Sequence, residues 1–197
     1  MRYEFFETIK VVDGVHLNVD FHQARYESVL KSFGVQNELQ LKSFFHAPNK
    51  GLFRCRIVYT LDALVQIKYL AYKKRKINSL KLLYDDDIEY KYKSTSRDAL
   101  DALFERREGC DDLLVVKNGL ITDTTIANIA LQKDGIWYSP KSALLEGTTR
   151  ARYLQEKKVI LKDIKVEELE SYTQVALLNS MIGFDIITPN KGDLFVR

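Results

Sequence analysis

Three Asx-Gly dipeptides set the strongest limit on how this chain folds. Asp13-Gly14, Asn118-Gly119 and Asp134-Gly135 each separate two short segments rich in β-branched, aromatic and aliphatic residues. An Asx-Gly pair between two such segments favours a two-residue hairpin turn. The sequence therefore predicts a series of β-hairpins and a sheet structure that is largely antiparallel.

Hydrophobic periodicity divides the 197 residues into an N-terminal α/β domain at 1–75 and a C-terminal domain at 76–197. In the first domain we expect strands at 2–12, 15–19, 52–60 and 64–72, and helices at 20–33 and 37–46. In the second we expect strands at 79–84, 88–92, 113–117, 120–122, 126–132, 136–138, 159–164, 173–179 and 184–187, and helices at 97–108, 148–157 and 166–171. A capping box of Asp20 and Gln23 is expected to start the first helix. The expected fold class is α+β, with two small mixed domains.

Composition argues against several classes of function. The formal net charge is only +3, and the one dense basic run, residues 73–76, is typical of a solvated linker. Cys55 and Cys110 are the only cysteines and the three histidines are scattered, so we expect no zinc site and no disulfide framework. No apolar run approaches the ~20 residues of a membrane span. We therefore expect a cytoplasmic protein that binds no metal ion, nucleic acid or membrane.

A lysine and a carboxylate suggest a particular chemistry. Lys93 ends an alternating segment that predicts a strand. Tyr90 and Tyr92 would lie on one face of this strand, and Lys91 and Lys93 on the other. Asp123 lies on a turn between two predicted strands. A lysine amine can form a Schiff base with an aldehyde, and a buried carboxylate can keep a pyridine nitrogen protonated. The pair suggests pyridoxal phosphate, although spacing alone does not separate Lys93 from Lys91.

Two further segments could bind the phosphate of such a cofactor. Residues 147–150 (Gly-Thr-Thr-Arg) open a predicted helix, and the amides of a helix N-terminus bind phosphate readily. Ordinary capping by Thr148 is the alternative. Arg25 lies with His22 beside the apolar stripe of the first helix, where it could bind phosphate bidentately. The alternative is that Arg25 is an ordinary surface arginine with no ligand.

Six segments, in order along nearly the whole chain, resemble the fold-type IV pyridoxal-phosphate enzymes. This is the class IV aminotransferase family, which includes aminodeoxychorismate lyase. The segments are FETIKVVDG at 6–14, HQAR at 22–25, YKSTSR at 92–97, ITDTTIANI at 121–129, GTTR at 147–150 and LNSMIG at 178–183. The resemblance implies a D-amino acid aminotransferase-like fold, with the cofactor at the interface of the two domains, and a homodimer.

The resemblance also implies roles for individual residues. Lys93, rather than Lys91, would hold pyridoxal phosphate and move the proton at the substrate's α-carbon. Asp123 would face the pyridine nitrogen, at a position where the family usually has glutamate. The residues expected to bind the phosphate are Arg25, Thr148, Thr149 and Ser180.

The spacing of Lys93 and Arg97, together with the segment before Thr8, resembles the lyases of this family. It implies conversion of 4-amino-4-deoxychorismate to 4-aminobenzoate and pyruvate, a step of folate biosynthesis, with Thr8 as a candidate proton relay. The alternative is an aminotransferase that acts on branched-chain or D-amino acids. Two other hypotheses are a non-catalytic cofactor-binding protein, suggested by Asp123, and nucleic-acid binding through residues 72–76.

Overall fold

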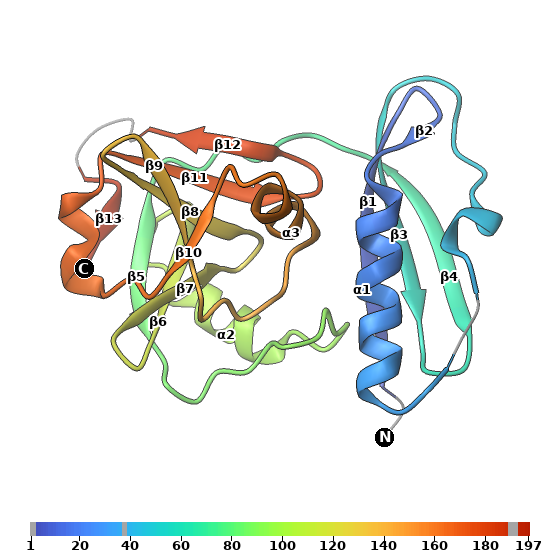
Figure 1. Ribbon diagram of the computed structural model, residues 1–197, viewed down its shortest axis with the longest axis horizontal. Helices are drawn as coiled ribbons and strands as arrows, with labels where there is room; N and C mark the ends of the chain where they lie inside the picture. Colours follow the sequence, from blue (N-terminus) through green and yellow to red (C-terminus); the bar gives the residue numbers. More distant parts are fainter. Residues whose placement is uncertain (1–2, 37–38, 189–192) are drawn as a thin grey trace. The chain divides into compact units, whose positions relative to one another are not determined.

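The computed structural model describes residues 3–36, 39–188 and 193–197, and it divides into two compact units (Figure 1). The first unit comprises residues 1–74 and 92–96, and the second comprises 75–91 and 97–197. Each unit has its own sheet and its own hydrophobic core. The predicted α+β class is confirmed.

The first unit is a four-stranded antiparallel sheet with one long helix on one face. The strand order is β2-β1-β3-β4, with β1 at Phe5–Val12, β2 at Val15–His16, β3 at Leu52–Tyr59 and β4 at Leu64–Ala71. Helix α1, Val19–Ser32, buries Tyr26, Val29 and Leu30 in a core that it shares with the sheet. Residues 5, 7, 9 and 11 of β1 are all buried, whereas residues 8, 10 and 12 are only partly covered. One face of the sheet therefore builds the core.

The segment around Lys93 packs on the edge of β1. The amide of Phe6 donates to the carbonyl of Lys93 at 2.8 Å, and the amide of Thr95 donates to the carbonyl of Glu4 at 2.9 Å. Phe5 and Ser94 form an isolated antiparallel bridge. Backbone pairing thus fixes the position of Lys93 relative to the first strand.

The second unit is built on a nine-stranded mixed sheet. Seven strands lie in the order β10-β9-β8-β7-β6-β5-β13, while β11 pairs with β8 and with β12. The strands are β5 Leu80–Tyr84, β6 Asp112–Lys117, β7 Leu120–Thr124, β8 Asn128–Lys133, β9 Ile136–Pro140, β10 Ile160–Lys162, β11 Gln174–Asn179, β12 Gly183–Ile187 and β13 Phe195–Val196. The helical elements are α2 Asp98–Glu105, α3 Thr148–Gln155 and the 3₁₀ segment η2 Val166–Ser171.

Strand β6 is buried on both faces, which explains its unbroken apolar sequence. Leu114 and Val116 belong to the larger core, and Leu113 and Val115 belong to a second cluster that includes Leu100 and Leu103 of α2.

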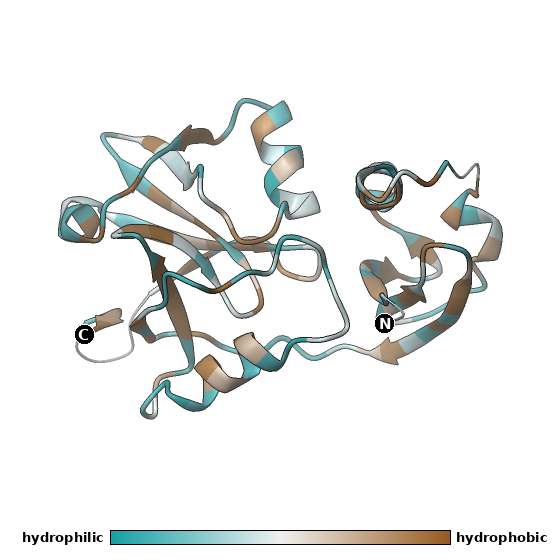
Figure 2. Ribbon diagram, turned by 90° about the horizontal axis from the view of Figure 1, so that it is seen from below, coloured by the Kyte–Doolittle hydropathy of each residue, from teal (hydrophilic) through white to brown (hydrophobic). Residues whose placement is uncertain are grey.

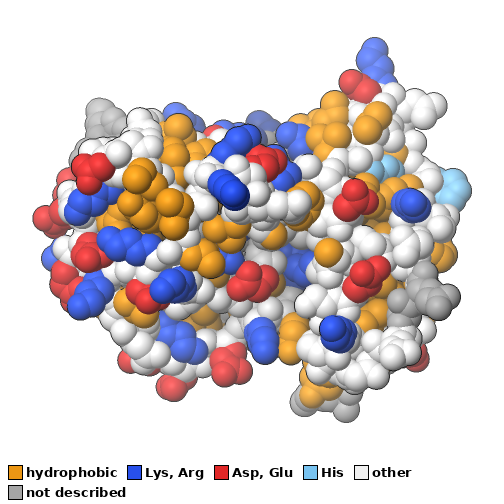
Figure 3. All heavy atoms as spheres, viewed as in Figure 1, with side chains coloured by type: hydrophobic (Ala, Val, Ile, Leu, Met, Phe, Trp, Pro, Cys, Tyr) orange, Lys and Arg blue, Asp and Glu red, His pale blue; other side chains and the backbone are white. Residues whose placement is uncertain are grey.

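In Figure 2 the apolar colouring follows the strands, whereas many of the loops between them are polar. In Figure 3 basic and acidic side chains are interspersed over the face in view. Within the described residues, no helix is both long and apolar enough to span a membrane.

The three Asx-Gly turns form as the sequence predicts. Asp13-Gly14 has φ angles of 46° and 83°, Asn118-Gly119 has 52° and 74°, and Asp134-Gly135 has 52° and 76°. These turns join β1 to β2, β6 to β7 and β8 to β9. Both positions of each turn are left-handed, which is the conformation that Asx and Gly tolerate best.

Two predicted elements of the first domain differ from the structure. The expected helix at 37–46 is a single 3₁₀ turn, η1 at Leu41–Phe44, and residues 37–38 lie outside the described chain. Only Leu41 of that turn is buried, and one apolar anchor does not stabilise a longer helix. Helix α1 begins at Val19, and its N-cap is Asn18 rather than Asp20, with no side-chain cap hydrogen bond. The Gln23 amide instead donates to Glu27 and to the carbonyl of Leu39, so the predicted capping box is wrong.

The expected strand at 88–92 is also absent from the described residues. Tyr90 packs in the core of the second unit, whereas Tyr92 packs in the core of the first. The carbonyl of Ile88 accepts a hydrogen bond from the side-chain ammonium group of Lys117 at 2.7 Å. The alternation of residues therefore reflects burial in two different cores and not two faces of one strand.

Candidate functional site

The residues predicted to form the site fall into two groups, one in each unit. Thr8, Arg25 and Lys93 belong to the first unit. The second unit holds Asp123, Thr148, Thr149 and Ser180.

In the first unit, two cations lie against the ring of Phe6. The Lys93 Nζ lies 4.7 Å from the ring centroid, and the Arg56 Cζ lies 3.9 Å from it. Thr8 follows Phe6 on the same face of β1, and the strand register places Thr8 directly opposite Arg56. Lys93 and Arg56 thus contact one aromatic ring at distances typical of cation–π contacts, and Thr8 lies on the same face of the sheet.

The face of this sheet that points away from α1 is strongly basic. The register pairs Lys10 with Arg54, and Arg56 with both Thr8 and Lys68. Among the described residues of β1, β3 and β4, no Asp or Glu lies on this face. A group with more than one negative charge would therefore be attracted to it.

On the opposite face, Arg25 forms a buried ion pair with Glu7. The Arg25 Nε donates to Oε1 of Glu7 at 2.8 Å, and the Arg25 Nη2 donates to Oε2 at 2.6 Å. His22, one turn earlier on α1, places Nδ1 2.6 Å from Oε2. Glu7 is fully buried and His22 is 1% exposed.

Electrostatics keep Glu7 ionised in this cluster. Burial alone would raise the pKa of Glu7, but the charge of Arg25 and the hydrogen bonds from His22 and Arg25 lower it to about 2. Burial lowers the pKa of His22, and the charges of Arg25 and Lys93 act in the same direction. His22 is therefore neutral near pH 7, and its Nδ1 must carry the hydrogen because an ionised Glu7 only accepts.

In the second unit, Asp123 is held at the end of β7 by two donors. The Asn128 Nδ2 donates to Oδ1 of Asp123 at 2.8 Å, and the Leu145 amide donates to Oδ2 at 3.0 Å. Burial raises the pKa of Asp123 to about 6, although these hydrogen bonds and the charge of Arg150 oppose the rise. A cation beside this carboxylate would favour its ionised form. Asp123 is thus a buried carboxylate whose two oxygens are both held by hydrogen bonds.

Asn128 also joins Asp123 to the start of α3. Its amide donates a second hydrogen bond, to the carbonyl of Leu145, at 2.8 Å. Its Oδ1 lies so close to Gly147 that a Cβ at that position would overlap with it. Thr148 and Thr149, the first two residues of α3, are each 6% exposed. The carboxylate and the helix N-terminus therefore form one packed assembly.

Three further hydrogen bonds hold the turn after Asp123. They involve Arg97, Asp112 and Asn179, and the sequence predicted no role for Asp112 or Asn179. Arg97 Nη2 donates to the carbonyl of Thr125 at 2.8 Å, and the Thr125 hydroxyl donates to the buried Asp112 at 2.7 Å. The Asn179 Nδ2 donates to the carbonyl of Ile126 at 3.2 Å. Asn179 precedes Ser180, so this contact relates the Ser180 turn to the Asp123 turn.

Glu7 and Asn128 lie within two of the segments that resemble the family, at 6–14 and 121–129, but the sequence predicts no role for either residue. The sequence signal for Glu7 is an acidic residue at a core position of a strand, which is rare unless the residue is paired. For Asn128 the signal is a polar residue at the start of a buried strand.

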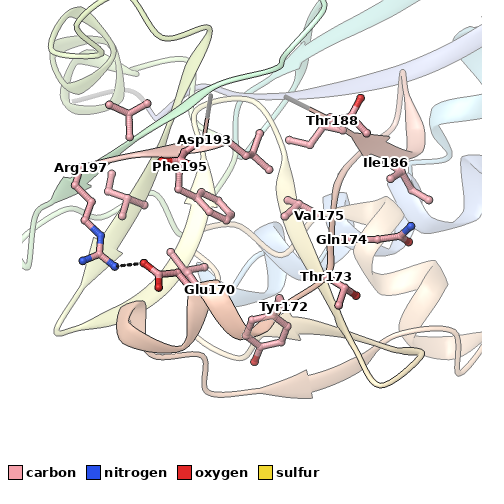
Figure 4. A pocket seen from close by; sticks show the side chains of 15 residues that line it. Glu170, Tyr172, Thr173, Gln174, Val175, Ile186, Thr188, Asp193, Phe195 and Arg197 are labelled. Carbon is pink, nitrogen blue, oxygen red and sulfur yellow. Dashed lines mark hydrogen bonds and ion pairs between the residues drawn. The ribbon is translucent and has the colours of Figure 1, made fainter. Parts of the chain in front are cut away.

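One cavity lies within the second unit. It has a volume of about 810 Å³ and is lined by residues of β5, η2, β11, β12 and β13, with Arg197 and Glu170 paired at its rim (Figure 4). None of the predicted site residues, all of which are described, lines it. Its apolar wall is formed by Leu82, Val175 and Phe195.

One family model and two proteins of known sequence are similar to this chain. The sequence model of the family described as amino-transferase class IV matches residues 4–188. An uncharacterized protein of Haemophilus influenzae is 32% identical over 187 residues, covering 92% of this chain and 99% of the relative. A provisionally named aminodeoxychorismate lyase of Schizosaccharomyces pombe is 34% identical over 90 residues, or 41% of this chain and 39% of that protein.

Solved structures are similar over most of the chain. A crystal structure from Haemophilus somnus, provisionally named 4-amino-4-deoxychorismate lyase, has a TM-score of 0.85 at 32% identity and covers 93% of this chain and 98% of its own. The PLP-bound form of a hypothetical aminotransferase from Mycobacterium tuberculosis has a TM-score of 0.76 at 16% identity, covering 97% and 82%. The second likeness concerns the fold alone.

Proposed function

The chain belongs to the class IV aminotransferase family, and from this we propose that it is a pyridoxal-phosphate-dependent lyase. The proposed reaction converts 4-amino-4-deoxychorismate to 4-aminobenzoate and pyruvate. The Haemophilus somnus structure that shares 32% of its sequence carries that provisional name, which supports the choice within the family.

The donor groups in the two units fit the functional groups of pyridoxal phosphate. Lys93 offers a primary amine for the aldehyde, and the buried Asp123 offers a carboxylate for the pyridine nitrogen. Arg25, the start of α3 and Ser180 offer donors for the phosphate. When bound, this cofactor supplies a protonated ring that accepts the electrons released at the substrate's α-carbon.

The protein's own groups then have to move protons and orient the substrate. We assign removal of the proton at the substrate's α-carbon to the Nζ of Lys93, and its relay to the hydroxyl of Thr8, which lies on the same face of β1 as Phe6. Loss of the enolpyruvate side chain makes the ring of the substrate aromatic. Because that step is favourable by itself, orientation and proton transfer are the main contributions required of the protein.

The single observation that carries the choice of substrate is the basic face around Phe6. 4-Amino-4-deoxychorismate has two carboxylates, whereas a branched-chain amino acid has one carboxylate and an apolar side chain. Arg56 lies against the same ring as Lys93, and Lys10, Arg54 and Lys68 occupy the same face. This arrangement favours a dicarboxylate over an apolar amino acid.

The test is turnover by the purified protein loaded with pyridoxal phosphate. 4-Amino-4-deoxychorismate is generated in a coupled reaction, and 4-aminobenzoate and pyruvate are measured separately. The proposal predicts equal amounts of both products and their loss in Lys93→Ala. Parallel reactions contain L-leucine or D-alanine with 2-oxoglutarate. Rapid glutamate formation from either amino acid, without 4-aminobenzoate from the first substrate, would instead establish the aminotransferase alternative.

A further inference from the structure

Three side-chain hydrogen bonds hold the buried cluster of Glu7, His22 and Arg25 together. Both carboxylate oxygens of Glu7 are used, and Arg25 binds them through two different nitrogens. Two parallel hydrogen bonds fix the plane of a guanidinium as well as its position. The bond from His22 to Oε2 holds the carboxylate itself in place.

The charges of this cluster cancel, which limits what it can contribute to anion binding. Glu7 is ionised and His22 is neutral, so the negative charge of Glu7 offsets the positive charge of Arg25. If attraction alone bound a phosphate here, Glu7 would weaken the binding. The carboxylate of Glu7 therefore adds no attraction for an anion, and what it supplies is a pair of hydrogen bonds that fix the guanidinium of Arg25.

We propose that Glu7 is a positioning residue, which fixes the guanidinium of Arg25 in the orientation that binds the cofactor phosphate. A guanidinium has five N–H donors in a rigid plane, and the pair with Glu7 occupies the Nε–Nη2 edge. The plane of the guanidinium is then fixed by a carboxylate that is fully buried in the core. This inference rests on the proposed function only in taking pyridoxal phosphate as the cofactor.

The test compares two ligands that differ only in the phosphate. Dissociation constants of pyridoxal phosphate and of pyridoxal are measured for the apoprotein by equilibrium dialysis, and the ratio of the two constants reports the phosphate contribution. The variants are Glu7→Gln, Arg25→Gln, their double variant, and Glu27→Gln. Glu27 is exposed on the same helix, so its substitution changes the net charge equally without touching the cluster.

Positioning by Glu7 predicts that Glu7→Gln weakens binding of pyridoxal phosphate tenfold or more and leaves pyridoxal binding within twofold. It also predicts no further loss when Glu7→Gln is added to Arg25→Gln, because the carboxylate acts through the arginine. Glu27→Gln should leave the ratio unchanged. Lyase turnover is not used in this test, so a protein that lacks the proposed reaction can still confirm the inference.

Three results would overturn the proposal. Tighter binding of pyridoxal phosphate by Glu7→Gln would show that charge outweighs geometry. An equal loss of both ligands would show a purely structural role, and a wild-type protein without preference for pyridoxal phosphate would show that Arg25 binds no phosphate. If Glu7→Gln does not fold, Glu7→Asp keeps the charge but withdraws the carboxylate by one methylene. The same loss of phosphate preference is expected for it, and an unchanged ratio would contradict the positioning role.

Discussion

The side-chain oxygen of Asn128 occupies the space that a Cβ atom at Gly147 would need. Gly147 has φ −71° and ψ 137°, a conformation that alanine adopts without strain. Alanine at position 147 is therefore opposed by the steric overlap with Asn128 and not by backbone strain. Asn128 cannot move aside cheaply, because its amide donates to both Asp123 and the carbonyl of Leu145.

We expect Gly147→Ala to displace Asn128 and to release Asp123. The lost hydrogen bonds and the forced contact should lower the free energy of unfolding by about 1–3 kcal/mol. Urea denaturation of the apoprotein measures this loss. The double variant Gly147→Ala with Asn128→Ala removes the clashing group, so the two changes should be less than additive. Strict additivity would mean that the two residues do not interact.

The raised pKa of Asp123 predicts how stability depends on pH. Its pKa rises from 3.8 to about 6 on folding, so the folded state holds this proton more tightly. The associated stability is complete below about pH 4 and is lost as the pH rises through 6. A difference of this size corresponds to about 3 kcal/mol. The change should appear in urea denaturation of the wild-type apoprotein between pH 4 and 7.

Asp123→Asn isolates that contribution from other titrating groups. Glu7, with a pKa lowered to about 2, loses its contribution only as the pH falls from about 4.5 toward 2, outside most of this range. Asp112 is buried and has a raised pKa, but it is present in both proteins. The difference between the wild type and Asp123→Asn should therefore follow Asp123 alone. Parallel stability curves from pH 4 to 7 would contradict the assignment.

Two tyrosines on neighbouring strands offer a matched pair of stability tests. The Tyr59 hydroxyl is buried and has no hydrogen-bond partner among the described residues, whereas the Tyr69 hydroxyl contacts both His16 and the amide of His46. Tyr59→Phe removes an unsatisfied polar group and should raise the free energy of unfolding by about 1 kcal/mol. Tyr69→Phe should lower it by about the same amount. Destabilisation by Tyr59→Phe would show that its hydroxyl is satisfied in solution.

Arg56 tests whether the basic face recognises a dicarboxylate. Arg56→Gln should raise KM for 4-amino-4-deoxychorismate tenfold or more, because a charge-assisted contact to a carboxylate is lost. The affinity for pyridoxal phosphate should stay within twofold. Arg106→Gln, an exposed change of the same charge in the other unit, is the control and should leave KM unchanged. An unchanged KM in Arg56→Gln would remove the main support for the dicarboxylate substrate.

Local chemistry explains which parts of the fold were predictable. The hairpin turns follow from Asx-Gly pairs, and β6 follows from its continuous apolar run. The prediction of a strand at 88–92 was wrong, because an alternating pattern indicates which residues are buried but not which part of the protein buries them. Tyr90 and Tyr92 pack into separate cores, and only the tertiary structure distinguishes that outcome from two faces of a strand.

The candidate site was predictable as a set of segments but not as a set of contacts. Lys93, Asp123 and Arg25 were candidates from their chemistry, the resemblance implied their roles, and those roles stay predictions. The Glu7 carboxylate that holds Arg25 is 18 residues away from it in sequence, and Asn128 meets Gly147 across a loop. No spacing rule relates such pairs, because they meet only when the strand and the helix have packed.

The most direct test of the whole account is to locate the lysine that binds the cofactor. The purified protein is loaded with pyridoxal phosphate and reduced with borohydride, and its peptides are analysed by mass spectrometry. Lys93 should carry the reduced cofactor in the wild type and in Lys91→Ala, and Lys93→Ala should lose both the adduct and the visible absorbance band. A cofactor adduct on Lys91, or an unchanged band in Lys93→Ala, would contradict the account.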